Sequence, residues 1–332
     1  MSSESIIQLL ENAIYARTDL FDSKHESAFR LFNGFSEGYP HLTLDVYGQT
    51  LVIHNYAEDI VGSQALVENV IKYLSTTLHW LRAGILKIRN GKTQAEKNGI
   101  LIFGEKAETK IKEHGVWYSI DLTMNRDTSF YLDTRHLRKW LIGNMQGKSV
   151  LNTFAYTGSF GVAAFAGGAV RVLQQDINRK FLNLAKSSYV LNGFPIRTQD
   201  FVTADFFPAV AKLKSTKQSF DCVILDPPFF STTPKGKVEQ ENNSARLINK
   251  VRPLINDGGY LAAINNALYA SGKEYLGTLE SLCANGYLKI DELILVPEDF
   301  TGHNIVTEPI TDPSPFNHST KIALLKVRKK HL

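Results

Sequence analysis

Helices and strands alternate along most of this chain, and this alternation is the feature that most constrains its fold. From about Asn125 onward, apolar runs of strand length alternate with helical patterns in units of about thirty residues. Such alternation is typical of a parallel sheet whose strands are joined by right-handed helical crossovers. Two further strands, at 288–296 and 321–327, are expected to follow one another through a long loop without a helix. The predicted fold is therefore α/β, with a Rossmann-like, doubly wound, mostly parallel seven-stranded sheet and an antiparallel last strand.

The preceding residues have a different pattern. The length of 332 residues is ample for two domains. Residues 1–30 predict a helix and a charged connector, and residues 31–124 predict a small α+β domain that contains a hairpin at 42–46 and 51–54. Residues 125–332 then form the Rossmann-like domain.

Charge and cysteine content exclude several classes of protein. The formal net charge of +4 is a weak indication of a polyanionic partner, and the most basic stretch, 326–330, is interpreted as a solvated strand end. Cys222 and Cys283 lie in unrelated contexts, which argues against a disulfide framework or a cysteine metal site and suits a reducing cytosol. No apolar run approaches the roughly 18 residues of a membrane span. We therefore expect a soluble, cytoplasmic protein without a metal ion.

Polar and glycine residues follow three successive strands of the predicted sheet. The first strand leads into a turn with Gly158 and Gly161, which permit close backbone approach to a ligand. About twenty residues later Asp176 ends the second strand, where a carboxylate can accept both ribose hydroxyls. Asp205 and Phe206 follow the third strand and are suited to an adenine ring. Taken singly, Asp176 and Asp205 are equally well explained as helix N-terminal charges; their occurrence at successive strand ends favours a nucleoside site.

Two nucleoside cofactors compete for this architecture. NAD needs a third glycine in the correct register and a helix N-terminus aimed at its pyrophosphate, and neither is evident here. S-adenosylmethionine has no phosphate and needs only a turn, a ribose carboxylate and an adenine slot. The sequence therefore predicts S-adenosylmethionine.

The fourth strand ends in an Asp-Pro-Pro-Phe-Phe motif that begins at Asp226. Pro227 and Pro228 fix the backbone and remove two N–H donors, so that carbonyl groups can face a substrate. Asp226 can accept hydrogen bonds from a base edge, and Phe229 or Phe230 can stack on a flipped base. The competing interpretation is a strand stop followed by core aromatics.

These motifs resemble those of a known family, the class I RNA methyltransferases related to the bacterial 23S ribosomal RNA enzymes RlmI and RlmK. The resemblance covers roughly residues 31–327 and includes the segments 33–48, 128–135 and 152–161 and the Asp-Pro-Pro-Phe motif. It implies that the small domain faces the substrate and that the stretch 130–135 helps to hold the cofactor. The candidate cofactor residues are Phe130, Asp133, Arg135, Asn152, Phe154, Tyr156, Thr157, Gly158, Asp176, Ile177, Asp205, Phe206 and Asp226. The candidate catalytic residues are Asp226, Pro227, Pro228 and Phe229.

The chain departs from this family in two respects. Some members begin with a PUA-type RNA-binding domain, for which the residues before Leu31 are too few. Members that methylate cytosine at C5 carry a nucleophilic cysteine after the fifth strand, where this chain has Asn265 and Asn266, either of which can read a base edge or simply end the strand. Attack by C5 requires a thiolate adduct, so a base nitrogen, N7 or exocyclic, is the favoured acceptor.

The resulting prediction is an S-adenosylmethionine-dependent methyltransferase that modifies a base nitrogen in RNA, with ribosomal RNA during its processing as the favoured substrate. One alternative is a methyltransferase whose acceptor is a protein, DNA or a small molecule. Another is a cofactor-binding RNA adaptor without activity, against which the intact motif at Asp226 argues. The expected partner is RNA and not a membrane, and the sequence leaves a monomer and a homodimer both open.

Overall fold

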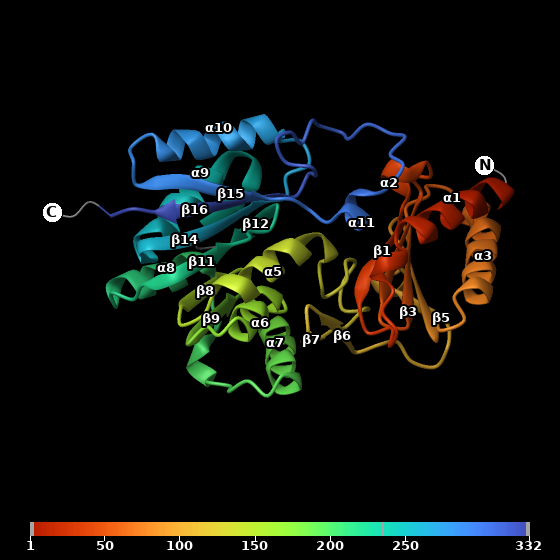
Figure 1. Cartoon of the computed structure of the whole chain (residues 1–332), viewed down its shortest axis with the longest axis horizontal. Coiled ribbons are helices and arrows are strands. Elements are labelled where there is room, and N and C mark those ends of the chain that lie inside the picture. The colour runs from red at the N-terminus through yellow and green to blue at the C-terminus, as the bar shows by residue number, and fades with distance from the viewer. Residues whose placement is uncertain (1–2, 234–235, 330–332) are drawn as a thin grey trace. The chain divides into compact units, whose positions relative to one another are not determined.

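The computed structural model describes the backbone of residues 3–233 and 236–329, with the side chains of 3–4, 230–233, 236–237 and 239–243 left out (Figure 1). The chain divides into two compact units. The first comprises Met1–Leu132 together with Pro297–Glu308, and the second comprises Asp133–Val296 together with Pro309–Leu332. Each unit is described by itself.

The first unit is built on a five-stranded sheet in the order β1-β2-β3-β4-β5. Only the pair β3–β4 is parallel, and the crossover that a parallel pair requires is the helix α3. Buried apolar side chains of α1 and α3, among them Ile6, Leu10 and Leu74, form the core with one face of the sheet. The predicted hairpin is confirmed, with Tyr47 paired to Thr50 at its turn. The elements are α1 (Ser3–Ala16), η1 (Thr18–Leu20), β1 (Ala28–Asn33), α2 (Gly34–Glu37), β2 (Leu42–Tyr47), β3 (Thr50–Asn55), α3 (Ile60–Thr77), β4 (Ala83–Ile88), α4 (Gln94–Asn98), β5 (Ile100–Phe103), β6 (Lys110–Glu113) and β7 (Val116–Ser119).

Residues 297–308, which the sequence analysis assigned to the Rossmann-like domain, pack in the first unit. They contain a short helix, α11 (Glu298–Thr301), so the expectation of a helix-free loop is wrong. Pro297 and the acidic residues of the first turn favour a helix start there. The Asp299 carboxylate accepts the backbone N–H of Arg30 at 3.0 Å, and Glu37 accepts that of His303 at 2.6 Å. These contacts stabilise the segment against β1 and α2.

The second unit carries a seven-stranded sheet in the order β10-β9-β8-β11-β14-β16-β15. The pairs from β10 to β14 are parallel, and β16 runs antiparallel to both of its neighbours. The predicted sheet is thereby confirmed. Its strand order reverses between β8 and β11, where such folds bind ligands. The strands are β8 (Ser149–Thr153), β9 (Arg171–Asp176), β10 (Phe201–Thr203), β11 (Phe220–Leu225), β14 (Ile255–Asn265), β15 (Leu288–Ile294) and β16 (Lys321–Val327).

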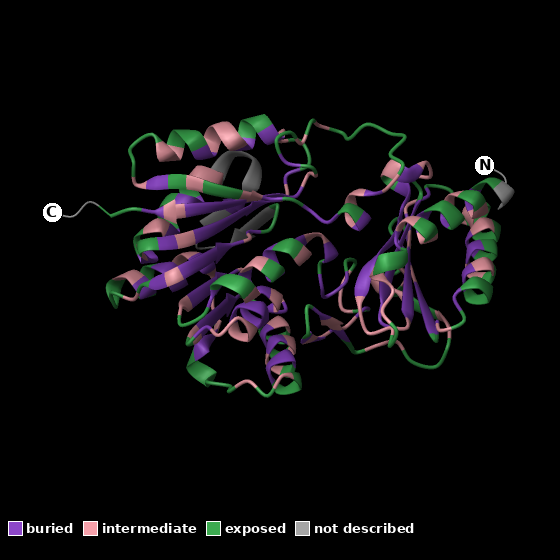
Figure 2. Cartoon of the chain, in the orientation of Figure 1, coloured by how far each residue is buried: buried purple, intermediate pink, exposed green. Residues whose placement is uncertain are grey.

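Helices cover both faces of this sheet (Figure 1). Neighbouring residues of one strand alternate between two cores: Val150 packs with α5 and α6, and Leu151 packs with α8, α9 and α10. Both faces are therefore apolar, and the central strands are buried along their length (Figure 2). A small hairpin, β12–β13, directly follows the Asp-Pro-Pro motif, which the sequence analysis did not predict. The remaining elements are η2 (Leu132–Thr134), α5 (Arg135–Asn144), α6 (Ser159–Ala166), α7 (Arg179–Leu191), η3 (Thr198–Asp200), α8 (Phe206–Ser215), β12 (Phe230–Thr233), β13 (Gly236–Glu239), α9 (Gln240–Val251), η4 (Arg252–Leu254) and α10 (Gly272–Cys283). In the described part of the chain, none of the helices has both the length and the apolarity that crossing a bilayer requires.

Candidate active site

The loops after β8, β9, β10 and β11 begin at one edge of the seven-stranded sheet. The register shows this directly, because Thr153 pairs with both Gln175 and Leu225. Hydrogen bonds then join the loops: the Ala155 N–H donates to the Gln175 carbonyl at 2.8 Å, and the Ala204 N–H donates to the Asp176 carbonyl at 3.0 Å. The residues that follow these four strands therefore share the carboxyl edge of the sheet.

The turn after β8 is supported by a buried side chain, Gln174. Its amide donates to the Gly158 carbonyl at 3.2 Å and accepts from the Asn152 amide at 2.8 Å. Gly158 has a φ of 76°, and a Cβ on Gly161 would lie 2.1 Å from the Gln174 amide nitrogen. Glycine is thus required for the turn to approach β9 so closely. Sequence reasoning assigned no role to Gln174, because nothing local reveals that it faces this turn.

Asn152 presents an unused acceptor to the site. The side chain is fully buried, and its Oδ1 has no hydrogen-bond partner among the described residues. A buried acceptor without a partner costs free energy, so such an atom in a ligand site is a natural contact for a ligand donor. Thr157, from the same turn, is also buried, and Tyr156 has a positive φ of 50°.

Asp176 ends β9 beneath this turn. Its carboxylate accepts the N–H groups of Tyr156 and Asn178, each at 2.8 Å. Burial raises the pKa of the Asp176 carboxyl above its ordinary value, although its backbone donors pull that pKa down. Ile177 beside it is 61% exposed, an apolar side chain open to a ligand. That Asp176 orients the ribose diol stays a prediction.

Asp205 and Phe206 follow β10. The Asp205 carboxylate accepts the N–H of Phe207 at 2.9 Å and caps α8, so the helix-cap interpretation of Asp205 holds in the structure. The Phe206 ring is buried and stacks on Phe154 at a centroid distance of 4.6 Å. The two rings thus pack against each other beside the turn. Contact of Asp205, Phe154 or Phe206 with adenine stays a prediction.

Asp226 lies just beyond β11, and its acidity is strongly perturbed. Burial raises the pKa of its carboxyl to about 7, with a further contribution from the negative charge of Asp133. Asn266, after β14, donates to Asp226 Oδ1 at 3.2 Å, while the Thr320 hydroxyl donates to Asp133 Oδ2 at 2.8 Å. The two carboxyl groups are thus held by residues that adjoin other strands of the sheet.

The remaining residues of the motif differ in exposure. Pro227 is buried, Pro228 is exposed, and the Phe229 side chain is 46% exposed. The side chain of Phe230, the other stacking candidate, lies outside the described residues. Phe229 is therefore the described aromatic group of the motif that can meet a planar substrate.

The two asparagines after β14 have different roles. The Asn265 amide donates to the Ser244 hydroxyl at 3.1 Å and accepts the N–H of Ala267 at 2.9 Å, so it shapes the loop. Asn266 contacts Asp226. Lys321, fully buried on the neighbouring strand, donates to the Ala267 carbonyl at 3.0 Å. The sequence offered no local indication of Lys321 or Thr320, because β16 joins the sheet only through the tertiary fold.

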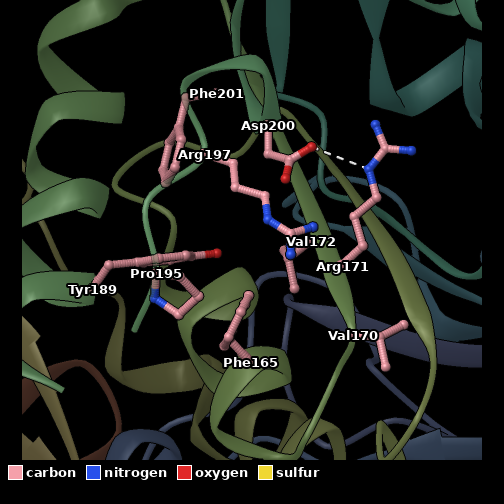
Figure 3. A pocket seen from close by; sticks show the side chains of 9 residues that line it. All are labelled: Phe165, Val170, Arg171, Val172, Tyr189, Pro195, Arg197, Asp200 and Phe201. Atoms are coloured by element: carbon pink, nitrogen blue, oxygen red, sulfur yellow. Dashed lines mark hydrogen bonds and ion pairs between the residues drawn. The ribbon is translucent and has the colours of Figure 1, made fainter. Parts of the chain in front are cut away.

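A separate small cavity, of about 10 Å³, lies at the opposite edge of the sheet (Figure 3). Arg171, the first residue of β9, and Asp200, just before β10, line it and form an ion pair at 3.1 Å. Phe165, Tyr189 and Phe201 surround the space. Because it lies at the amino ends of the strands, this cavity is distinct from the candidate site.

Comparison with known proteins identifies the family. A model of the S-adenosylmethionine-dependent methyltransferase family matches residues 29–301. The chain belongs to this family. Its relatives include a Bacillus subtilis protein provisionally named ribosomal RNA large subunit methyltransferase YwbD, 29% identical over 88% of this chain and 74% of that protein. Ribosomal RNA large subunit methyltransferase I of Vibrio cholerae is 30% identical over 77% of this chain and 65% of its own length. Among solved structures, SMU.776, provisionally described as a methyltransferase and complexed with SAH, has a TM-score of 0.85 at 24% identity and covers 98% of this chain and 82% of its own.

The methyltransferase cofactor is S-adenosylmethionine, and the residues at the carboxyl edge fit it. The buried acceptor Asn152 Oδ1, the Asp176 carboxylate and the exposed Ile177 offer polar and apolar contacts to a nucleoside. Phosphate-binding features are not needed for this cofactor.

Two candidate cofactor residues lie near the division of the chain. Phe130 belongs to the first unit, where its buried ring packs on Tyr118 at 4.9 Å and its carbonyl accepts the Tyr47 hydroxyl at 2.9 Å. Arg135 is the first residue of α5 in the second unit. Their contacts with the cofactor stay predictions.

Neither cysteine of the methyltransferase is placed for nucleophilic catalysis. Cys222 is fully buried within β11, and burial raises the pKa of its thiol to about 12. Cys283 ends α10 and packs at the border of the core. Cys222 therefore has the core position that the sequence suggested, whereas Cys283 is only partly buried.

Proposed function

We propose that this methyltransferase methylates a base nitrogen in RNA, and that its natural substrate is ribosomal RNA. The names of the relatives from Bacillus subtilis and Vibrio cholerae support the choice of substrate. The observation that carries the proposal is the group formed by Asp226, Asn266 and Phe229 after two neighbouring strands. It combines a carboxyl, a carboxamide and an exposed aromatic ring, which are the groups that hold a planar base.

The chain's own residues mainly align the acceptor and exclude water. S-adenosylmethionine, when bound, supplies a methyl group on a sulfonium that is intrinsically reactive. Asp226, as a carboxylate, accepts an N–H of the base, and Phe229 stacks on its face. Asn266 fixes the Asp226 carboxyl through their 3.2 Å hydrogen bond. The preorganised pair thus reduces the entropy lost in reaching an in-line geometry.

The acceptor atom follows from the chemistry of the groups at the site. Attack by C5 of a pyrimidine needs a thiolate to activate the ring, whereas Cys222 is buried with a raised pKa. The ring nitrogen N7 carries no proton and requires no general base. An exocyclic amine loses a proton after transfer, and Asp226 is the described carboxylate of the motif that can accept it. We therefore assign the methyl group to N7 or to an exocyclic nitrogen.

The remaining assignments belong to the same proposal. Asn152, Phe154, Tyr156, Thr157, Gly158, Asp176 and Ile177 hold the cofactor, with Asp205, Phe206, Phe130, Asp133 and Arg135 completing its surroundings. The domain of residues 31–124 faces the RNA. The reaction takes place in the cytoplasm, and sedimentation will decide between a monomer and a homodimer.

One experiment tests the choice of acceptor. The purified protein is incubated with methyl-labelled S-adenosylmethionine and with separate RNA, DNA and protein fractions from bacterial cells. We expect label in RNA, removed by the Asp226→Asn substitution and located on a base nitrogen by mass spectrometry of the nucleosides. Label in protein or DNA with RNA unlabelled contradicts the proposal and selects the alternative acceptor.

A further inference from the structure

A row of paired residues crosses the second unit's sheet toward its amino edge. Val150, Cys222, Tyr260, Lys326 and Lys289 are direct neighbours on β8, β11, β14, β16 and β15. Paired residues of adjacent strands point to the same face, and neighbouring strands lie about 5 Å apart. The row begins with buried residues and ends with two lysines, Lys326 on β16 and the exposed Lys289 on the edge strand β15.

Lys289 and Lys326 form a like-charge pair directly across β15 and β16. Such pairs destabilise a sheet. Among the described residues, no carboxylate forms an ion pair with either ammonium group. The pairing of Lys289 with Lys326 by itself therefore does not stabilise the sheet.

A third lysine converges on the same row. The ammonium groups of Lys148 and Lys326 lie 5.5 and 5.4 Å from the centre of the Tyr260 ring, and Trp140 packs edge-on against this ring at 5.2 Å. Lys148 also donates to the Asn144 carbonyl at 2.7 Å. The Tyr260 ring thus attracts both ammonium groups.

Lys289 and Lys326 border a hollow of about 430 Å³. Four basic residues line it, and two carboxylates accompany them; one of these, on Asp257, accepts the backbone N–H of Lys329 at 2.7 Å. The basic residues are Lys289, Lys326, Arg328 and Lys329, and the acidic residues are Asp257 and Asp291. The positive charge is thus gathered around a concave surface.

We propose that Lys148, Lys289 and Lys326, hereafter the lysine row, bind the phosphate backbone of the RNA substrate outside the active site. The inference rests on the proposed function. Lys326 pairs with Tyr260, five residues before Asn265 at the site, which corresponds to about 17 Å along the strand. An RNA that places one base at Asp226 has further phosphates within reach of the row. Phosphate contacts of this kind position a nucleic acid without reading its sequence.

The test compares two triple variants that lose the same charge. One is Lys148→Gln/Lys289→Gln/Lys326→Gln. Its control is Lys212→Gln/Lys217→Gln/Lys250→Gln, three exposed lysines of the same unit on or after α8 and α9. Binding of a fluorescein-labelled 23S ribosomal RNA transcript is measured by anisotropy across a salt titration, with S-adenosylhomocysteine affinity as a check of folding.

We expect the first variant to lose affinity for RNA by about 10- to 100-fold and the control by less than about threefold. The slope of log affinity against log salt should become shallower by about 2 to 3, from roughly 0.7–0.9 for each phosphate contact. Equal losses in the two variants overturn the inference. A lysine-row variant that loses binding to phosphatidylglycerol vesicles but still binds RNA also overturns the inference. That result would assign the lysine row to a lipid surface. Failure of the wild type to methylate RNA contradicts the proposed function. The comparison of RNA binding between the two variants can still be interpreted in that case, because it does not depend on methyl transfer.

Discussion

The carboxyl pKa values of two aspartates near the ends of one strand, β11, are shifted in opposite directions. Burial tends to raise the pKa of both, yet the Asp221 carboxyl at the amino end has a lowered pKa because it accepts the Ser149 N–H and hydroxyl, each at 2.8 Å, and the Asn256 amide at 2.7 Å. Asp226, just beyond the carboxyl end, accepts a hydrogen bond from Asn266 and has a pKa of about 7. The same strand thus carries, at one edge of the sheet, a carboxylate that accepts three hydrogen bonds and, at the other edge, a carboxyl group that accepts one from Asn266.

For the carboxyl groups, this difference distinguishes a structural role from a functional one. At the amino edge Asp221 is saturated by donors and Asp200 is paired with Arg171. At the carboxyl edge Asn152 Oδ1 and Gln175 Oε1 are buried without hydrogen-bond partners among the described residues, and Asp226 faces Asp133. Buried groups left short of partners cost stability, and this cost is typical of sites that await a ligand.

The substitution Asp226→Asn is expected to have the largest effect on activity, and Asp221→Asn is its matched control. Removal of the negative acceptor from Asp226 should lower kcat about 100- to 1,000-fold, the range seen for other groups that stabilise a transition state. Asp221→Asn should leave kcat within about threefold and lower the free energy of unfolding by about 1–3 kcal/mol, since it weakens three hydrogen bonds. Labelled methyl transfer and urea denaturation measure the two effects. An inactive Asp221→Asn that remains folded breaks the comparison.

Asp176 and Asp200 form a second matched pair, on β9 and beside it. Asp176→Asn should weaken binding of S-adenosylhomocysteine about 10- to 100-fold, because a charged acceptor in the ligand site is worth about 1.5–3 kcal/mol. Asp200→Asn only weakens a partly exposed ion pair, so its effect on affinity should be negligible. Isothermal titration calorimetry measures both affinities. Similar affinities for the two variants would remove Asp176 from the cofactor site.

The acidity of Asp226 predicts a pH dependence. If the carboxylate is the active form, kcat/KM rises with pH and levels off above about 7, so that activity at pH 6 is about one tenth of its maximum. Because the folded pKa lies above the unfolded value, the folded protein binds the proton more tightly, and the Asp226 contribution to stability falls as pH rises from about 4 to 7. The profile of Asp226→Asn should lack this inflection. An unchanged inflection would assign it to another group.

Substitutions of two glycines are expected to have the smallest effects, and they test the close approach of the turn to β9. Gly161→Ala places a Cβ against the Gln174 amide and should lower the free energy of unfolding by about 1–3 kcal/mol, with weaker cofactor binding. A Cβ added at Gly143, in α5, would meet no described atom within 4 Å, so Gly143→Ala should raise stability by about 0.5–1 kcal/mol. Thermal unfolding with and without S-adenosylhomocysteine distinguishes the two. Tolerance of alanine at 161 would contradict the close approach of turn and strand.

The sequence predicted those features that are encoded locally. The alternation of helices and strands indicated the seven-stranded sheet, and the turn at 152–161 together with Asp176 and Asp226 falls on one edge because carboxyl ends of parallel strands coincide. The helix cap formed by Asp205 was one of the two interpretations that its position allowed.

Features that depend on distant contacts were not predictable in this way. Gln174 supports the turn from another strand, and Thr320, the residue just before β16, donates a hydrogen bond to Asp133. The segment 297–308 joins the first unit through Arg30 and Glu37, which lie more than 250 residues earlier in the chain. No local pattern indicates such partners, because hydrophobic periodicity reports which face is buried and not against what.

A crystal structure of the protein with S-adenosylhomocysteine tests the position of the cofactor site most directly. We expect the adenosine at the carboxyl edge, with its ribose hydroxyls on the Asp176 carboxylate and a donor on Asn152 Oδ1. A ligand bound instead among Arg171, Tyr189 and Asp200 at the amino edge would contradict this assignment.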